Sequence, residues 1–155
     1  GNFGAPVKAC GCGEGAIARY QKKLSGPILD RIDIQINVAR ESYEKLASSA
    51  VNGPSPIEMR ATIALVREIQ HQRFKEANLA TNSEMGPKEI AIYCKLDQTG
   101  SDFVKKVVTT HSLSGRGYHK ILKLARTIAD INGQSSIALP HLAEAVSYRI
   151  QSEMI

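Results

Sequence analysis

The sequence predicts a mainly α-helical fold, in which a helical bundle follows a short N-terminal region with one β-strand. From residue 55 onward, apolar residues recur at three- and four-residue spacing in five segments separated by capping or turn residues. Strict alternation of apolar and polar residues, which is typical of a strand, occurs once, over residues 32–38. With 155 residues, 43% of them hydrophobic, the chain can bury a core of its own.

The N-terminal region is predicted to hold a helix, a turn and then the strand. A Gly/Cys/Ala-rich start precedes a helical segment over residues 16–24, and the turn is Ser25-Gly26-Pro27. The apolar face of the strand is Ile32, Ile34, Ile36 and Val38. A single strand needs backbone partners, and the sequence offers no second one. We therefore expect a C-terminal piece of a larger protein, whose upstream strands complete the sheet. The alternatives are a cryptic helix and a strand that pairs across a dimer.

The first helix of the bundle is predicted to begin at a capping box, Ser55-Pro56-Ile57-Glu58, with proline at the first helical position. It is expected to end near residues 74–78 and to be followed by a polar linker over residues 79–86. Its predicted core-facing stripe is Ile57, Ala61, Ala64, Leu65 and Ile69.

Four more helices are predicted after this linker. The second bundle helix runs from Pro87 to about Leu96, and the third begins with Thr99 as its cap. The fourth begins near Gly115 after the cap Ser114 and ends at Asn132-Gly133, and Pro140 opens the fifth. The inward residues are expected to be Ile90, Tyr93 and Cys94; Phe103, Val104, Val107 and Val108; Tyr118, Ile121, Leu122, Ala125, Ile128 and Ala129; and Leu142, Ala143, Val146 and Ile150.

Composition and charge narrow the classes of function. The net charge of +5 permits contact with nucleic acid without requiring it, because acidic residues are interleaved through most of the chain. Only 5% of residues are aromatic and there is no tryptophan, which argues against a base-stacking platform. No apolar run reaches membrane-spanning length, so no membrane partner is expected. Three cysteines, an odd number, favour a reducing compartment and hence the cytoplasm.

Two arginines occupy positions at which they could bind a phosphate. Arg116, next to Gly115, falls in the first turn of the predicted fourth helix, where the helix dipole disfavours a cation and favours an anion. Arg31 follows a turn at the mouth of the strand, where it could be presented to a neighbouring subunit. The alternatives are a solvated Arg116 and a surface ion pair of Arg31 with Asp30 or Asp33, contributing at most about 1 kcal/mol.

Taken together, the two arginine segments resemble the magnesium-chelatase-like AAA+ ATPases of the ComM/YifB type. The segments are LSGPILDRID over residues 24–33 and LSGRGYHKILKLARTIAD over residues 113–130, and the resemblance covers nearly the whole chain. It implies that residues 1–40 are the incomplete C-terminal edge of an α/β nucleotide-binding core, 41–54 a linker and 55–151 the helical lid domain. It also implies that Arg31 is an arginine finger acting on the adjacent subunit and Arg116 a sensor-2 arginine, with Gly115 at the nucleotide.

The same resemblance implies ATP and Mg²⁺ as cofactors, the upstream ATPase core and neighbouring ring subunits as partners, and DNA remodelling in branch migration or recombination during competence. Magnesium insertion into a porphyrin is a weaker implication. The sequence contains no Gly-x-x-x-x-Gly-Lys-Ser/Thr loop and no apolar strand ending in paired acids, so we expect no tight ATP binding and no hydrolysis by this chain alone. The alternative functions are a free-standing helical nucleic-acid-binding module and an oligomerisation adaptor.

Two further groups of residues are candidates for binding. Cys10 and Cys12 could form half of a zinc site, and in the resembled family a second Cys-x-Cys pair just upstream would complete it. The predicted fourth helix carries a basic face of Arg116, Lys120, Lys123 and Arg126, which could contact DNA phosphates. A solvated helix face or a contact between subunits is the alternative for these basic residues.

Overall fold

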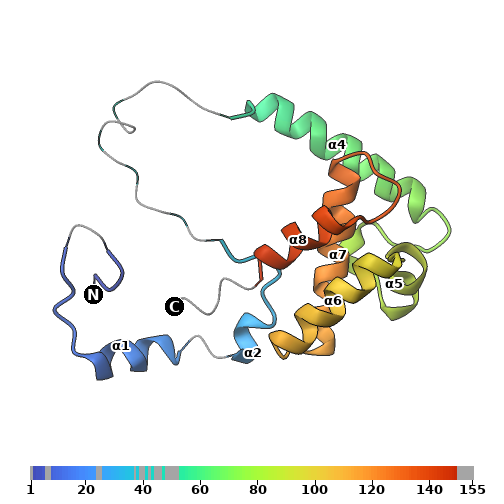
Figure 1. Cartoon of the computed structure of the whole chain (residues 1–155). Coiled ribbons are helices and arrows are strands. Elements are labelled where there is room, and N and C mark those ends of the chain that lie inside the picture. The colour runs from blue at the N-terminus through green and yellow to red at the C-terminus, as the bar shows by residue number, and fades with distance from the viewer. Residues whose placement is uncertain are drawn as a thin grey trace.

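Helix α7, Gly115–Ile131, is the central element of the fold (Figure 1). The computed structural model describes residues 2–5, 8–23, 26–36, 38, 41, 43, 47 and 53–149. Four elements contact α7: helix α8, Leu139–Ser147; helix α4, Pro56–Arg73; helix α5, Pro87–Tyr93; and the 3₁₀ turn η1, Asn82–Glu84. Helix α6, Gln98–Thr110, packs on α8. The prediction of a mainly helical fold with a helical bundle is confirmed.

Both ends of α7 form as the sequence predicts. The side chain of Ser114 caps its start by accepting a hydrogen bond from the Gly117 N–H at 3.0 Å. At its end, Gly133 adopts a φ of +66°, and the N–H of Gln134 donates to the carbonyl of Ala129 at 2.8 Å. A positive φ suits glycine, and these bonds satisfy carbonyls that the helix leaves unpaired. Between the two ends, Ile121, Leu122, Ala125, Ile128 and Ala129 are buried as predicted, and Tyr118 is partly buried.

Helix α4 begins at the predicted capping box but buries a different face. The Ser55 N–H donates to Glu58 Oε2 at 2.7 Å, and the Glu58 N–H donates to Ser55 Oγ at 3.3 Å. The predicted core-facing stripe is wrong, because Ile57 and Leu65 are 77% and 69% exposed. The buried residues are Val66 and Gln70, in the second half of the helix. The first half extends beyond the other helices in Figure 1, and its large apolar residues Ile57, Met59 and Ile63 are exposed.

The segment predicted as a polar linker, residues 79–86, contributes to the core. Asn82, in η1, and Met85 are 2% and 1% exposed. Helix α5 then turns Ile90 and Cys94 inward as predicted, and the partly buried ring of Tyr93 meets the ring of Phe74 edge-on, with centroids 5.3 Å apart.

Helices α6 and α8 differ from the prediction in single residues. The cap of α6 is Asp97 rather than Thr99, because Asp97 Oδ1 accepts from the Gly100 N–H at 2.7 Å. Val104 and Val107 are buried as predicted, whereas Phe103 and Val108 are partly buried. Helix α8 has Pro140 in its first turn and buries Leu142 and Val146, but Ala145 takes the core position predicted for Ala143. Ile150 lies outside the described residues.

The predicted strand over residues 32–38 is not formed in the described part of the chain. Residues 32–36 and 38 lie in no strand, and the exposed fractions of Ile32, Ile34, Ile36 and Val38 run from 39% to 81%. A strand needs a partner strand for its backbone groups. The backbone bonds of the described residues here are a turn bond from the Ile32 N–H to the Leu29 carbonyl at 3.2 Å and a bond from the Gln35 N–H to the Tyr148 carbonyl at 2.8 Å. Asn37 lies outside the described residues.

Two short helices precede this segment. Helix α1, Glu14–Gln21, has no buried residue and lies apart from the bundle in Figure 1, and helix α2, Gly26–Leu29, occupies part of the predicted turn. Leu24, Ser25 and most of the predicted linker 41–54 lie outside the described residues. No helix within the described ranges is both long enough and apolar enough to cross a bilayer.

Candidate functional site

The first turn of α7 presents Arg116 at the end of the bundle. Ser114 has an extended backbone, with φ −67° and ψ 160°, and its hydroxyl holds the Gly117 N–H, so the helix begins at Gly115. Arg116 is exposed, and a Cβ at Gly115 would meet nothing within 4 Å. The N-terminal end of α7, with its partial positive charge and a guanidinium beside it, therefore opens to space that an anion could enter.

Arg31 stands in the turn that follows α2. The turn is held by hydrogen bonds from the Arg31 N–H to the Ile28 carbonyl at 3.0 Å and from the Ile32 N–H to the Leu29 carbonyl at 3.2 Å. The side chain of Arg31 is exposed. This turn places Asp30 against the first turn of α7.

Asp30 joins the two arginine segments. The Ser114 hydroxyl donates to the carboxylate of Asp30, with distances of 3.0 and 3.1 Å to its two oxygens. These residues are 84 positions apart in the sequence, so the contact is made by the fold alone. The residue before Arg31 thus touches the residue that caps the helix of Arg116, and the structure brings the two predicted functional segments together.

Arg149, two residues after α8, also binds this segment and was not identified from the sequence. Its Nη2 lies 3.3 Å from Asp30 Oδ1, and its Nη1 donates to the Ile32 carbonyl at 3.0 Å. Together, Asp30, Ser114 and Arg149 form a junction between the turn of Arg31 and the bundle. Only 7% of Arg149 is exposed, and its Nε is the one buried side-chain nitrogen or oxygen, within the described ranges, that lacks a hydrogen-bond partner. The signal in the sequence was its spacing, since Leu142, Val146 and Arg149 fall on one helical stripe.

Two of the predicted basic residues of α7 bind oxygens of the chain itself. The ammonium of Lys120 donates to the Arg31 carbonyl at 2.5 Å and pairs with Asp33 Oδ1 at 2.7 Å. Lys123 donates to the Ser83 carbonyl at 2.8 Å. Lys120 thus fastens the turn of Arg31 to α7, and Lys123 fastens η1 to the same helix.

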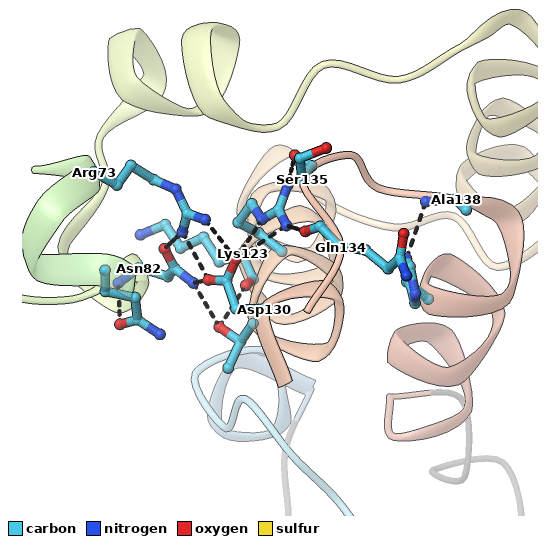
Figure 2. Close-up of polar contacts among 11 residues, drawn as sticks. Arg73, Asn82, Lys123, Asp130, Gln134, Ser135 and Ala138 are labelled. Atoms are coloured by element: carbon cyan, nitrogen blue, oxygen red, sulfur yellow. Dashed lines mark hydrogen bonds and ion pairs between the residues drawn. The ribbon is translucent and has the colours of Figure 1, made fainter. Parts of the chain in front are cut away.

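Arg126 does not belong to an exposed basic face, because only 2% of it is exposed. Its Nε donates to Asp130 Oδ1 at 3.0 Å, and its Nη atoms donate to the carbonyls of Gln134 and Ser135 (Figure 2). Asp130, which neutralises Arg126, lies one helical turn later and next to the predicted core residues Ile128 and Ala129. The sequence therefore already indicated that this ion pair is buried.

The same carboxylate also binds a second arginine from α4. Arg73 donates to both oxygens of Asp130, at 2.7 and 2.5 Å, and Asn82 Nδ2 donates to Oδ2 at 2.8 Å (Figure 2). Asp130 is fully buried as a side chain. A buried carboxylate is stable only when its oxygens are satisfied, which this network of α4, η1 and α7 achieves. The network is saturated by protein groups, so its role is structural.

The three cysteines occupy two different environments. Cys10 is partly exposed and Cys12 is exposed, and a hydrogen bond from the Cys12 backbone lowers the pKa of the Cys10 thiol. No cluster of three or more His, Cys, Asp or Glu side chains that could hold a metal occurs in the part of the chain that the structure describes. The half zinc site stays a prediction. Cys94 is buried in the core, as predicted, and burial raises the pKa of its thiol to about 11.

Comparison with known proteins gives matches over most of the chain. A family model for the C-terminal region of the magnesium chelatase subunit ChlI matches residues 53–149, and a model for magnesium chelatase subunit ChlI matches residues 1–46. The chain is 40% identical over 139 residues to competence protein ComM of Haemophilus influenzae, which covers 90% of the chain and 26% of that relative. It is 35% identical over 131 residues to the uncharacterized protein YifB of Escherichia coli, covering 84% of the chain and 25% of YifB. The chain therefore spans about a quarter of the length of these relatives.

Proposed function

Because this chain belongs to the magnesium chelatase family, we propose that it is the C-terminal lid portion of an AAA+ ATPase. In this proposal Arg31 is the arginine finger for the ATP site of a neighbouring ring subunit, and Arg116 is the sensor-2 arginine for the ATP bound by its own subunit. The ATP hydrolysed in this way drives DNA remodelling, in branch migration or recombination.

The hydrogen bond between Ser114 and Asp30 carries this proposal. It joins the turn of Arg31 to the start of the helix that bears Arg116, and both arginine side chains are exposed there. An exposed guanidinium favours an oxyanion with several charged oxygens, such as a phosphate, and that of Arg116 also stands at a helix N-terminus. Two exposed arginines at one junction suit the binding of phosphoryl oxygens.

The chemistry assigned to the two arginines is electrostatic. Bound ATP with Mg²⁺ supplies the phosphoryl group that is transferred to water, and a phosphate-binding loop and magnesium ligands would come from outside this sequence. Arg116 would bind phosphate oxygens from the lid, and Arg31 would stabilise the charge that develops on the phosphoryl group of the neighbour. Neither residue has to gain or lose a proton, since arginine stays charged.

DNA is the proposed partner for two reasons. The relative from Haemophilus influenzae is named a competence protein, and competence is the uptake of DNA by cells. The net charge of +5 favours association with a polyanion. Lys120, Lys123 and Arg126 bind oxygens of the chain itself. We therefore propose that other surfaces of the assembled ring contact the DNA.

The test is the steady-state ATPase activity of the full-length ATPase with Arg31→Ala or Arg116→Ala. Each substitution should cut turnover by about a hundredfold or more, because an arginine at the transferring phosphoryl group contributes at least that much. Arg60→Ala, at an exposed arginine of α4, is the matched control and should leave turnover unchanged. Unchanged turnover in the Arg31 and Arg116 variants would refute the assignment of both residues.

A further inference from the structure

We infer that Arg149 is a positioning residue for ATP hydrolysis, which acts by holding the turn of Arg31 in one place on the helical bundle. This inference rests on the proposed function, in which Arg31 stabilises the charge on the transferred phosphoryl group. Arg149 itself contacts no nucleotide. Its guanidinium binds the residues on either side of Arg31, and these contacts fix the point from which the exposed Arg31 side chain extends.

The guanidinium of Arg149 binds both sequence neighbours of Arg31. Its Nη2 donates to Asp30 Oδ1 at 3.3 Å, and its Nη1 donates to the Ile32 carbonyl at 3.0 Å. Because the N–H groups of arginine form a rigid planar fork, two such contacts fix direction as well as distance. The backbone of Arg31 therefore cannot shift relative to Arg149 without breaking one of them.

The other bonds of this turn restrict the main chain at Arg31 further. The Arg31 N–H donates to the Ile28 carbonyl at 3.0 Å, and the Arg31 carbonyl accepts from the Lys120 ammonium at 2.5 Å. Both peptide groups next to the Cα atom of Arg31 are thus hydrogen-bonded, while its side chain is exposed. A fixed backbone beneath an exposed guanidinium suits a preorganised electrostatic contact with a substrate.

Arg149 is itself fixed to the bundle. Its N–H donates to the Val146 carbonyl at 2.9 Å, so its backbone continues from the end of α8, which buries Leu142 and Val146 and packs on α7. On the side of α7, a Cβ at Gly117 would lie 3.5 Å from Arg149 Nη2. The guanidinium therefore lies against the first turn of α7, and it ties the turn of Arg31 to both helices.

Packing alone does not account for an arginine at this position. Only 6% of the Arg149 side chain is exposed, and its Nε lacks a hydrogen-bond partner within the described residues. Burying a charged group with an unsatisfied nitrogen is unfavourable, and an apolar side chain of similar size is often tolerated as well or better in such a place. What arginine adds over an apolar residue is the pair of directed contacts beside Arg31.

The test compares turnover of the full-length ATPase with Arg149→Met, alone and combined with Arg31→Ala. Alone, Arg149→Met should lower kcat by about tenfold to a hundredfold, because misplacing a catalytic group by about 1 Å can have that effect. The KM for ATP should stay unchanged, since the weakened contact belongs to the transition state. In the Arg31→Ala protein, Arg149→Met should lower kcat no further, because the side chain that Arg149 positions is already absent.

Two further variants separate positioning from folding. Arg149→Lys keeps the positive charge but lacks the planar fork, so it should also lower kcat while circular dichroism shows an intact fold. This variant decides the question if Arg149→Met folds poorly. Arg60→Met, the same substitution at an exposed arginine of α4, is the matched control and should keep kcat.

The outcomes separate this role from the proposed function. If Arg31→Ala lowers turnover but Arg149→Met and Arg149→Lys keep it, the inference is refuted and the assignment of Arg31 stands. A further loss of kcat when Arg149→Met is added to Arg31→Ala would also refute the inference, because Arg149 would then act on folding or on another group. If Arg31→Ala itself retains turnover, the proposed function is refuted.

Discussion

At the scale of single residues, the environment of each ionisable group decides what it can do. Arg116 and Arg31 are exposed, whereas Arg126, from the same predicted basic face as Arg116, is buried against Asp130. The caps Ser114 and Ser55 could be predicted because capping depends on residues a few positions away. Arg149 could not be assigned a partner, because its partner Asp30 lies 119 positions earlier.

Substitution of Asp130 should strongly destabilise the fold. Asp130→Ala leaves the guanidiniums of Arg126 and Arg73, whose side chains are 3% and 14% exposed, without their carboxylate. Breaking such a buried pair costs about 3–5 kcal/mol, and denaturant unfolding followed by circular dichroism measures it. Asp102→Ala, at an exposed aspartate of α6, is the control and should change the free energy of unfolding little. Equal effects of the two substitutions would mean that the network contributes nothing.

The thiols should differ in reactivity. At pH 8 a thiol reagent should modify Cys10 and Cys12 rapidly, while Cys94 reacts only as the protein unfolds, because burial raises its pKa to about 11. Since the unfolded thiol has a pKa near 9.0, the stabilising effect of a neutral Cys94 is complete below pH 9 and is lost as pH rises through 11. Cys94→Ala should remove the slow phase of the reaction with the thiol reagent. If all three thiols of the unsubstituted protein react at the same fast rate, the prediction is wrong.

At the scale of the elements, helix α4 shows the limit of sequence patterns. Its capping box was predicted correctly, but its core-facing side was not, since apolar residues lie on more than one side of it. Ile57, Ile63 and Leu65 are exposed, and Val66 and Gln70 are buried. Which side is covered depends on where α7 and η1 lie, and that is not encoded within the helix. The prediction of a strand over residues 32–38 was wrong for a similar reason, because a strand forms only with partner strands outside the segment itself.

A pair of leucine substitutions should distinguish the covered and uncovered faces. Leu142→Ala in α8, where the side chain is fully buried, should cost about 2–5 kcal/mol of unfolding free energy. Leu65→Ala in α4, which is 69% exposed, should change it by less than about 0.5 kcal/mol. Thermal unfolding of the chain measures both. A large loss for Leu65→Ala would show that its face of α4 is covered in solution.

At the scale of the whole molecule, the chain consists of a helical bundle and an N-terminal region tied to it by polar contacts. Asp30, Arg31, Ile32 and Gln35 contact α7, its cap Ser114 and the two residues that follow α8, whereas α1 has no buried residue. The predicted boundaries at residues 40 and 55 stay predictions. The bundle alone buries the cluster of apolar residues that stabilises the fold.

The chain should bind DNA weakly. On α7, Lys120, Lys123 and Arg126 are held by protein oxygens. Binding to a labelled four-way junction, measured by fluorescence anisotropy, should therefore stay in the range of non-specific contacts, about 10⁻⁴–10⁻⁶ M at physiological salt. Lys123→Ala should alter this affinity little. Tighter binding with a steep salt dependence, lost in Lys123→Ala, would favour a free-standing nucleic-acid-binding module over the lid.

The long sequence separation within the junction of Asp30, Ser114 and Arg149 also sets the order of events while a ribosome makes the chain. Asp30 leaves the exit tunnel 119 residues before Arg149 does, and at about 5–20 residues per second this interval is on the order of 6–24 s. During that time α4, α5, α6, α7 and α8 are still being made, so the turn of Arg31 has no finished surface to dock on. The two arginines can take up their joint position only when translation has passed α8, so the segment made early is among the last to find its place.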